Sequence, residues 1–421
     1  MELLLNKSER IANSIERKIC DGAYTDKLPS EQTIAEEYAA ARMTAARALN
    51  LLVERGLAVR IPFKGTYVKK AAQRKIRVMG NDYFFRCLAD YVPRRFPGLS
   101  VVQVKSIHEA ELMILTTFTP FEYESRLLPL PRPMVERIEK AGRHYPLASR
   151  LHSSGKNCYG IPALFSPFLL AYDREPMREL EPGFEPYSLT LEQLPALKKK
   201  AEALNIALID PSQNPESLFY SLLDNLSEIP PKKKDFQKVF ELFDRLTESG
   251  DRQRFLFRMI TRHGASSLQK NGGDFDIAPI PLINGTRYCS LASETLFVNR
   301  DAENPDPLFE ICEASVMPDF QRILTAGHYA IPIHRDCALD SIGCPKYRDD
   351  FFFAEIGNLF FGRYNLPFPL KREIRFAFDD GKLTDRDKET ILQTLGYIEN
   401  ESRRNRFLLE KMHYYTGSTI A

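Results

Sequence analysis

The 421-residue sequence lacks the features of several protein classes. None of its seven cysteines forms a CxxC pair, and its seven histidines show no metal-ligand spacing. Scattered, unpaired thiols are typical of a reduced cytoplasmic protein, so we expect a cytoplasmic location and no metal site. No apolar run approaches the roughly 18 residues of a membrane span, and the apolar run near the start, 3–5, is too short for a signal peptide. We therefore expect no contact with a membrane.

Catalytic and cofactor-binding motifs are absent as well. The chain contains no GxSxG, HExxH, GxxxxGK[ST] or GxGxxG sequence. These are the common signatures of serine hydrolases, zinc proteases, P-loop proteins and dinucleotide-binding enzymes. Internal repeats and low-complexity tracts are missing too. We expect no catalytic residue and no cofactor.

Charge is unevenly distributed along the chain. The net charge is only +2, with 58 Lys and Arg against 56 Asp and Glu. Residues 1–75 hold 14 Lys and Arg against 9 Asp and Glu, a net +5, which leaves the remainder near −3. A basic N-terminal segment is consistent with DNA contact confined to one end of the molecule. A charge of this size is about equally common in small domains with other functions, so it does not decide the matter alone.

The segment 28–68 has the pattern of two helices joined by a tight turn and followed by a hairpin. Ser30 is placed to cap a short first helix through its hydroxyl. A second helix is expected over 42–55, with small and apolar residues on its inner face. Gly56 follows directly, where a left-handed C-cap is needed. This order of elements predicts a winged helix-turn-helix, whose second helix reads the major groove of DNA.

A further helix and two short strands complete the predicted domain. The helix is expected over 3–20, where isoleucines recur every fourth residue. The strands are expected over 57–61 and 66–69, joined by a basic turn.

Residues 5–70 resemble the DNA-binding domain of GntR-type bacterial transcription regulators. The resemblance is carried in order by the segments 28–31, 42–44, 55–57 and 65–68. The sequence departs from the family pattern at Ala41, where Ser is usual, at Ala46, where Arg is usual, and at Phe63, where Gly is common. The resemblance implies operator DNA as a partner and a homodimer as the binding form. The DNA contacts it implies are Ser30, Glu31, Arg42, Met43, Thr44, Arg47, Lys64, Gly65 and Thr66.

Two roles are open for Glu31. Its carboxylate can orient arginine side chains, or it can complement the positive end of the helix dipole in the first turn. The sequence favours neither.

From residue 76 onward the pattern changes to alternating strands and helices. Strands are expected at 76–79, 100–104, 112–115, 168–172, 206–209, 275–280 and 295–299. Helices are expected at 83–96, 191–204, 216–226, 235–249, 252–260, 305–324 and 386–411. Alternation of this kind favours α/β layers over a mostly parallel sheet.

This larger part of the chain resembles the extracellular solute-binding proteins of sugar ABC transporters. The segments that carry the resemblance, in order, are 94–101, 155–162, 168–176, 189–194, 275–281, 327–332 and 381–384. The resemblance implies two α/β lobes with a ligand cleft, and hinge crossings near 161–166 and 280–293. The expected fold is therefore multidomain: a winged helix-turn-helix over 1–70, a linker over 71–75, and a two-lobed α/β periplasmic-binding-protein-like domain over 76–421.

Ligand contacts are expected in loops that follow strands and at the two crossings. Mixed carboxylate, amide, hydroxyl and aromatic groups suit a polyhydroxylated solute, and ordinary loop polarity would give a similar mixture. The candidate residues are Asn81, Asp82, Tyr83, Thr116, Thr117, Phe118, Phe165, Ser166, Ser290, Ser293 and Glu294. A small-molecule effector, a sugar or a related solute, is the expected partner.

Two other hypotheses are open. A GntR-type head is also compatible in length with a pyridoxal-phosphate aminotransferase-like enzyme domain, which would need a Schiff-base lysine and an aspartate for the pyridine nitrogen. No convincing Ser-x-Lys setting is present, and Lys156 is better explained by the binding-protein motif. A solute-binding protein for transport is disfavoured by the DNA-binding head and by the absence of a secretion signal.

Overall fold

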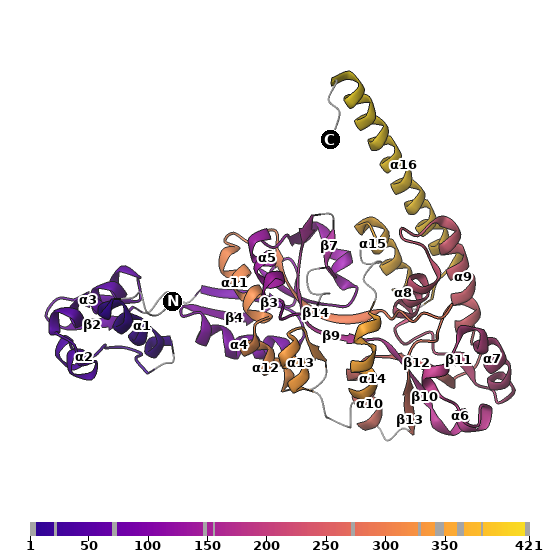
Figure 1. Cartoon of the computed structure of the whole chain (residues 1–421), viewed down its shortest axis with the longest axis horizontal. Coiled ribbons are helices and arrows are strands. Elements are labelled where there is room, and N and C mark those ends of the chain that lie inside the picture. Colours follow the sequence, from indigo (N-terminus) through magenta and orange to yellow (C-terminus); the bar gives the residue numbers. More distant parts are fainter. Residues whose placement is uncertain are drawn as a thin grey trace. The chain divides into compact units, whose positions relative to one another are not determined.

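The computed structural model (Figure 1) describes residues 6–20, 23–69, 74–145, 150–154, 156–270, 274–326, 330–341, 349–359, 366–379 and 382–416. The chain divides into two compact units, Met1–Leu112 and Met113–Ala421. No helix among the described residues combines the length and apolar character that crossing a bilayer requires.

The N-terminal unit begins with three helices and a hairpin. These elements are α1 (Lys7–Cys20), α2 (Glu31–Glu37), α3 (Arg42–Glu54), β1 (Ala58–Ile61) and β2 (Gly65–Val68). The two strands pair antiparallel, with Ile61 opposite Gly65. This is the winged helix-turn-helix that the sequence predicts.

The predicted helix ends are confirmed at atomic detail. The Ser30 hydroxyl accepts a hydrogen bond from the Thr33 backbone N–H at 3.1 Å, which caps α2. Gly56 has φ +73° just after α3, a conformation that costs glycine little. Ala41 precedes α3 without any side-chain cap. At the N-terminus of α3 only the Ala41 backbone carbonyl, which accepts from the Thr44 N–H at 2.8 Å, serves as a cap, and no Ala41 side-chain acceptor adds to it.

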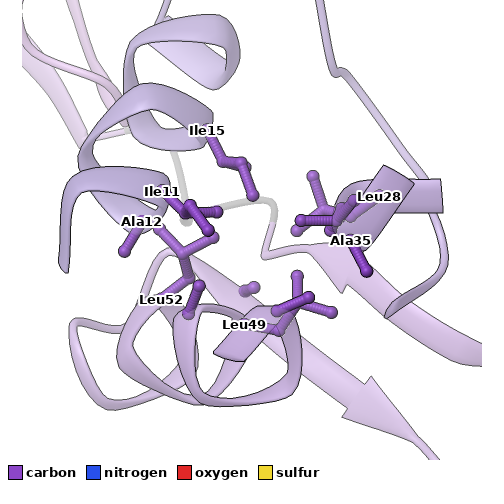
Figure 2. Close-up of a cluster of buried hydrophobic side chains, with 11 residues drawn as sticks. Ile11, Ala12, Ile15, Leu28, Ala35, Leu49 and Leu52 are labelled. Atoms are coloured by element: carbon purple, nitrogen blue, oxygen red, sulfur yellow. The ribbon is translucent and has the colours of Figure 1, made fainter. Parts of the chain in front are cut away.

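One compact hydrophobic cluster holds this domain together (Figure 2). Figure 2 shows Ile11, Ala12 and Ile15 of α1 facing Leu49 and Leu52 of α3. The spacing of these residues in each helix places them on one face, so the amphipathic pattern of the sequence becomes the core.

A second part of the N-terminal unit is a β–α–β segment: β3 (Arg74–Met79), α4 (Asp82–Arg95) and β4 (Leu99–Gln103). The two strands pair in parallel. The Glu111 carboxylate is buried beside β3, where it accepts from Arg74 Nη2 at 2.9 Å and from the Arg77 backbone N–H at 3.1 Å. Positions 71–73 of the predicted linker lie outside the described residues, and 74 and 75 belong to β3.

The C-terminal unit contains two sheets. One sheet has the order β15–β9–β14–β5, and β6 also pairs with β14; the other has the order β11–β12–β10–β13. The first set is β5 (Leu112–Thr116), β6 (Leu127–Leu128), β9 (Pro162–Pro167), β14 (Leu291–Asn299) and β15 (Ile331–Pro332). The second set is β10 (Leu169–Asp173), β11 (Ala207–Ile209), β12 (Phe255–Ile260) and β13 (Phe275–Ala278). The hairpin β7 (Ser153–Ser154) and β8 (Asn157–Cys158) stands apart.

The expectation of mostly parallel sheets is wrong. Strands β3–β4 and β11–β12 pair in parallel, but β9 is antiparallel to β14 and β15, and β10 is antiparallel to β12 and β13. The reason is the path of the chain, which leaves the first sheet after β9 and returns to it with β14. Neighbouring strands in one sheet can then run in opposite directions, which gives mixed sheets.

Helices cover both sheets. Helices α7 and α9 contact β11, α8 and α10 contact β12, and α11 contacts β14. The helices of this unit are η2 (Thr119–Arg126), α5 (Arg132–Ala141), α6 (Arg174–Leu180), η3 (Pro186–Ser188), η4 (Leu191–Gln193), α7 (Leu194–Ala203), α8 (Pro215–Leu226), α9 (Lys233–Thr247), α10 (Arg262–Lys270), α11 (Asp306–Ser315), α12 (Pro318–Thr325), α13 (Arg335–Asp340), α14 (Asp349–Ala354), η6 (Glu355–Asn358), α15 (Phe368–Ala377) and α16 (Asp385–Thr416).

The helix expected over 252–260 is a second correction, because Phe255–Ile260 forms strand β12. Four of its six residues are buried. A short apolar run buried on both faces has no strict alternation, so its periodicity does not distinguish strand from helix. Its place between β10 and β11, which only the tertiary fold supplies, decides the matter.

The chain passes between the two sheets at Phe168 and again between Ala278 and Leu291. The two crossings lie together: Leu291 pairs with Pro167, and the Phe168 N–H donates to the Ser290 carbonyl at 2.9 Å. The two sheets are therefore joined by adjacent strand ends, an arrangement suited to a hinge.

Candidate functional site

A groove of about 900 Å³ lies on the N-terminal domain. It is bordered by the start of α2, by α3 and by the hairpin. Of the predicted DNA contacts, the groove lining includes Ser30, Glu31, Arg42, Lys64, Gly65 and Thr66. The fold thus brings together residues that are up to 36 positions apart in the sequence (30 to 66).

Glu31 is the electrostatic centre of this groove. Its Oε1 accepts from Arg60 Nη2 at 2.8 Å, and its Oε2 lies 3.4 Å from Arg42 Nε. Glu31 also stands in the first turn of α2, so both roles considered for it are compatible with the structure. The carboxylate holds one arginine of α3 and one of the hairpin on the same side of the domain. Arg42 remains accessible, with 72% of its side chain exposed.

The remaining predicted contacts of α3 differ in accessibility. Met43 and Arg47 are exposed, Met43 to 83%, whereas Thr44 is half-buried. Thr66 is buried, and its backbone carbonyl accepts from the Leu28 N–H at 2.9 Å. The Ser30 hydroxyl is already engaged at the α2 cap. Contacts of Ser30 and Thr66 with DNA, through the backbone or through a reoriented side chain, stay a prediction.

Arg60 is a groove residue that the sequence did not single out. The signal was present, because 55–75 contains seven Lys and Arg and no Asp or Glu. Arg60 stands opposite Thr66 in the hairpin register, next to the groove. A hairpin without acidic residues beside an arginine-bearing helix suits a phosphate backbone.

In the N-terminal unit, the candidate ligand residues are at the start of α4. The Asn81 side chain caps the helix by accepting from the Phe84 N–H at 2.8 Å. Asp82 accepts from Gln103 Nε2 at 2.9 Å and is exposed. Tyr83 is half-buried. Their role toward a ligand remains a prediction.

In the C-terminal unit, the end of β5 and the loop after it hold three candidates beside β14. Thr117 adopts φ +48°, and its N–H donates to the Ser293 carbonyl at 2.8 Å. Thr116 is exposed, whereas Phe118 is buried and stacks on Tyr220 with ring centroids 4.9 Å apart. A left-handed backbone is unfavourable for a β-branched residue, and such strain is concentrated at functional sites.

The other candidates of this unit lie at or near the two crossings. Phe165 is opposite Ser293 in the β9–β14 register, and both are buried. Ser166 Oγ accepts from the Arg262 N–H at 2.9 Å, and Ser290 Oγ donates to the Ser217 carbonyl at 2.8 Å. These hydroxyls therefore tie the scaffold together where the chain crosses. Glu294 is half-buried on β14.

Two buried polar side chains near these candidates were not predicted. His152 Nε2 lies 3.0 Å from Thr295 Oγ1 and 3.3 Å from Ser293 Oγ, while its Nδ1 has no hydrogen-bond partner among the described residues. Burial lowers the pKa of His152 to about 3. Lys371 is fully buried, and the part of the chain that the structure describes offers no acceptor for its Nζ, which lies 4.9 Å from the ring centroid of Phe121. Burial lowers the pKa of Lys371 to about 7. The burial of both side chains results from packing between segments far apart in the sequence, which hydrophobic periodicity cannot reveal.

A buried ion pair lies near the first crossing. Arg262 Nε donates to Asp349 Oδ1 at 2.6 Å and Nη2 donates to Oδ2 at 3.0 Å, with the Arg262 side chain fully buried. Arg262 also donates from Nη1 to the Ala330 carbonyl at 3.2 Å. The pair ties the end of β12 to α14 and to the segment before β15. Bidentate geometry and these additional partners offset the cost of burying two charges.

Comparison with known proteins agrees with both halves of this description. Residues 7–68 match the family described as bacterial regulatory proteins, gntR family. A comparison with curated protein sequences finds no match.

The solved structures similar to this chain include solute-binding proteins. An ABC transporter solute-binding protein of Thermotoga lettingae TMO, bound to α-D-tagatose, has a TM-score of 0.55 and 14% identity over 76% of this chain and 99% of that one. T. maritima MalE3, bound to maltose, gives 0.54 and 13% over 77% and 99%. The GacH receptor of Streptomyces glaucescens, studied with acarbose, gives 0.53 and 14% over 76% and 97%. At these identities the likeness establishes the fold alone.

Residues 7–68 are therefore a gntR-family DNA-binding domain, and the larger part of the chain has the two-lobed α/β fold of ABC-transporter solute-binding proteins.

Proposed function

We propose that this protein is a ligand-responsive bacterial transcription regulator of the cytoplasm. It binds operator DNA as a homodimer through its N-terminal domain and senses a small solute, a sugar or related polyol, through its solute-binding fold. The observation that carries the proposal is the presence of these two domains in one chain. We propose no catalytic role.

The geometry of the N-terminal domain supports DNA binding by α3 and the hairpin. Arg42, Met43 and Arg47 are exposed on α3, where a recognition helix contacts base edges. Arginine pairs with guanine in the major groove, and apolar side chains contact the thymine methyl group. Lys64 in the hairpin turn is placed for a phosphate contact, which adds affinity without sequence preference.

The loop after β5 supports a ligand role for the solute-binding fold. Thr116 is exposed beside the strained Thr117, which Ser293 holds in place. A hydroxyl on a rigid strand end can donate and accept hydrogen bonds, as a polyol requires. Glu294, on the next strand, adds a carboxylate acceptor. We propose Thr116 and Glu294 as contacts of the effector.

Two binding assays with the full chain test this function. In vitro selection from random-sequence duplexes should enrich a preferred site with two half-sites about 34 Å apart, or a multiple of that distance. A thermal-shift screen with maltose, D-tagatose, D-mannitol and D-galactose should find a stabilising solute, because a ligand at 100 times its Kd adds about 2.7 kcal/mol to the free energy of unfolding. Selection that enriches no duplex would contradict the DNA half of the proposal, and a screen without any hit among sugars and polyols would contradict the sensing half.

A further inference from the structure

Phe63, at the tip of the hairpin, is the most exposed large hydrophobic side chain of the described residues. Its relative exposure is 110%, and its backbone has φ +63°. An aromatic residue is disfavoured in the left-handed region, where glycine is free of steric cost. The hairpin therefore presents an apolar ring to solvent in a conformation that a smaller residue would adopt more easily.

The surrounding turn fixes this presentation. The Lys64 N–H donates to the Ile61 carbonyl at 3.0 Å, which closes the turn around Phe63. Gly65 follows with φ +113°, and a Cβ there would come within 3.1 Å of Lys27 Cε. The closed turn therefore places Phe63 at the tip of the hairpin, where its side chain is exposed.

The charge around the ring indicates a partner that combines anionic groups on its surface with apolar faces beneath them. Of the residues that line the groove beside Phe63, Lys27, Arg42, Arg60 and Lys64 are basic and Glu31 is acidic, and no Asp or Glu stands between 55 and 75. A duplex offers both features, because phosphates border each groove and apolar base faces become accessible where a step opens. Proteins that insert Phe, Leu, Ile, Met or Pro between base pairs in the minor groove use this combination.

We propose that Phe63 is an apolar wedge that inserts at a base step in the minor groove next to the α3 site, opens that step and bends the DNA. The inference rests on the proposed DNA-binding function and adds a mode of recognition to it. Flexible pyrimidine–purine steps open most easily, so the wedge selects such a step at a fixed distance from the bases read by Arg42.

The test compares the full chain with its Phe63→Gly variant on a duplex recovered by in vitro selection with the wild-type chain. Glycine suits φ +63°, so the variant should fold at least as well as wild type, which thermal unfolding checks. We expect Phe63→Gly to weaken binding about tenfold or more, to lower the DNA bend seen in circular-permutation gels, and to abolish the fluorescence rise of 2-aminopurine placed at the opened step. Phe63→Trp should preserve all three signals.

Lys64→Ala is the matched control at the neighbouring position. It should weaken binding and flatten the salt dependence while leaving the bend and the 2-aminopurine signal unchanged. If Phe63→Gly binds the selected duplex as tightly as wild type and bends it equally, the wedge is wrong while the DNA-binding function stands. If Phe63→Gly instead dissociates the protein in sedimentation without DNA, the ring covers a second copy and the wedge is also wrong. Failure to enrich any duplex would refute the proposed function itself, and the wedge with it.

Discussion

Arg60 of the hairpin donates from Nη2 to Oε1 of Glu31 at 2.8 Å, so the hairpin is joined to the first turn of α2 by an ion pair that lies inside the groove. The second carboxylate oxygen lies 3.4 Å from Arg42 of α3. One acidic side chain thus positions two arginines that we propose to contact DNA. Because Arg42 and Arg60 are already oriented, their side chains lose less conformational entropy when they bind DNA.

The first prediction follows from this ion pair. Glu31→Gln removes one negative charge from the groove and releases both arginines. Affinity for random-sequence DNA should rise a few-fold, because the Glu31 carboxylate no longer repels the DNA phosphates. The ratio of selected-site to random-site affinity should fall, because the two arginines are no longer oriented. Fluorescence anisotropy with both duplexes measures the ratio. An unchanged ratio would show that Glu31 does not orient the arginines.

The second prediction concerns Arg42. Arg42→Ala should lower affinity for the selected duplex by roughly 1–3 kcal/mol and relax the preference at one base pair. Arg10→Ala, an exposed arginine on α1, is the matched control and should change affinity little. Selection repeated with Arg42→Ala identifies the base pair. Full affinity and an unaltered consensus in this variant would refute the assignment of α3 as the recognition helix.

The third prediction compares the two helix caps. Ser30→Ala removes the hydrogen bond to the Thr33 N–H and should cost about 0.5–2 kcal/mol in the unfolding of the N-terminal domain. Ala41→Ser should add a cap that α3 lacks and should stabilise by a similar amount. Chemical denaturation should therefore show a lower free energy of unfolding for Ser30→Ala than for wild type, and a higher one for Ala41→Ser. If both variants are less stable than wild type, the backbone N–H groups at the start of α3 already have other hydrogen-bond partners.

The fourth prediction is a pH dependence caused by Lys371. Burial lowers its pKa from 10.5 to about 7, so between these pH values the unfolded chain binds a proton that the folded chain does not. Stability should therefore rise as pH increases through this window, and below pH 7 the folded state carries the full cost of a buried ammonium group.

Lys371→Met removes that cost. The variant should be more stable than wild type at pH 6.5, and the difference should shrink toward pH 9 in urea titrations. Lys382→Met, at an exposed position, controls for the loss of one charge. A stability difference between Lys371→Met and wild type that stays constant with pH would show that Lys371 does not titrate in this range.

The N-terminal domain was predictable in detail because its determinants are local. Ser30, Gly56 and the apolar positions of α1 and α3 each act within a few residues, and the structure places all of them as expected. Strand β12 was mistaken for a helix because its identity depends on the strands beside it. The pairing of Arg60 with Glu31, the burial of Lys371 and the pair of Arg262 with Asp349 could not be predicted for the same reason. Each depends on partners brought close only by the tertiary fold. The ligand candidates stay a prediction. Asn81 and Thr117 lie in or beside loops after strands as expected, whereas Phe165 and Ser293 lie inside strands β9 and β14 and are buried.

The central claim is that a solute and DNA influence each other's binding to this chain. The most direct test titrates the stabilising solute from the thermal-shift screen into the full chain, alone and saturated with the selected duplex, by calorimetry. Linkage requires that DNA change the solute Kd by the same factor as the solute changes the DNA Kd, and we expect a factor of about 5–150. Glu294→Ala should remove this coupling and keep DNA affinity. Solute Kd values that are identical with and without DNA would contradict the account.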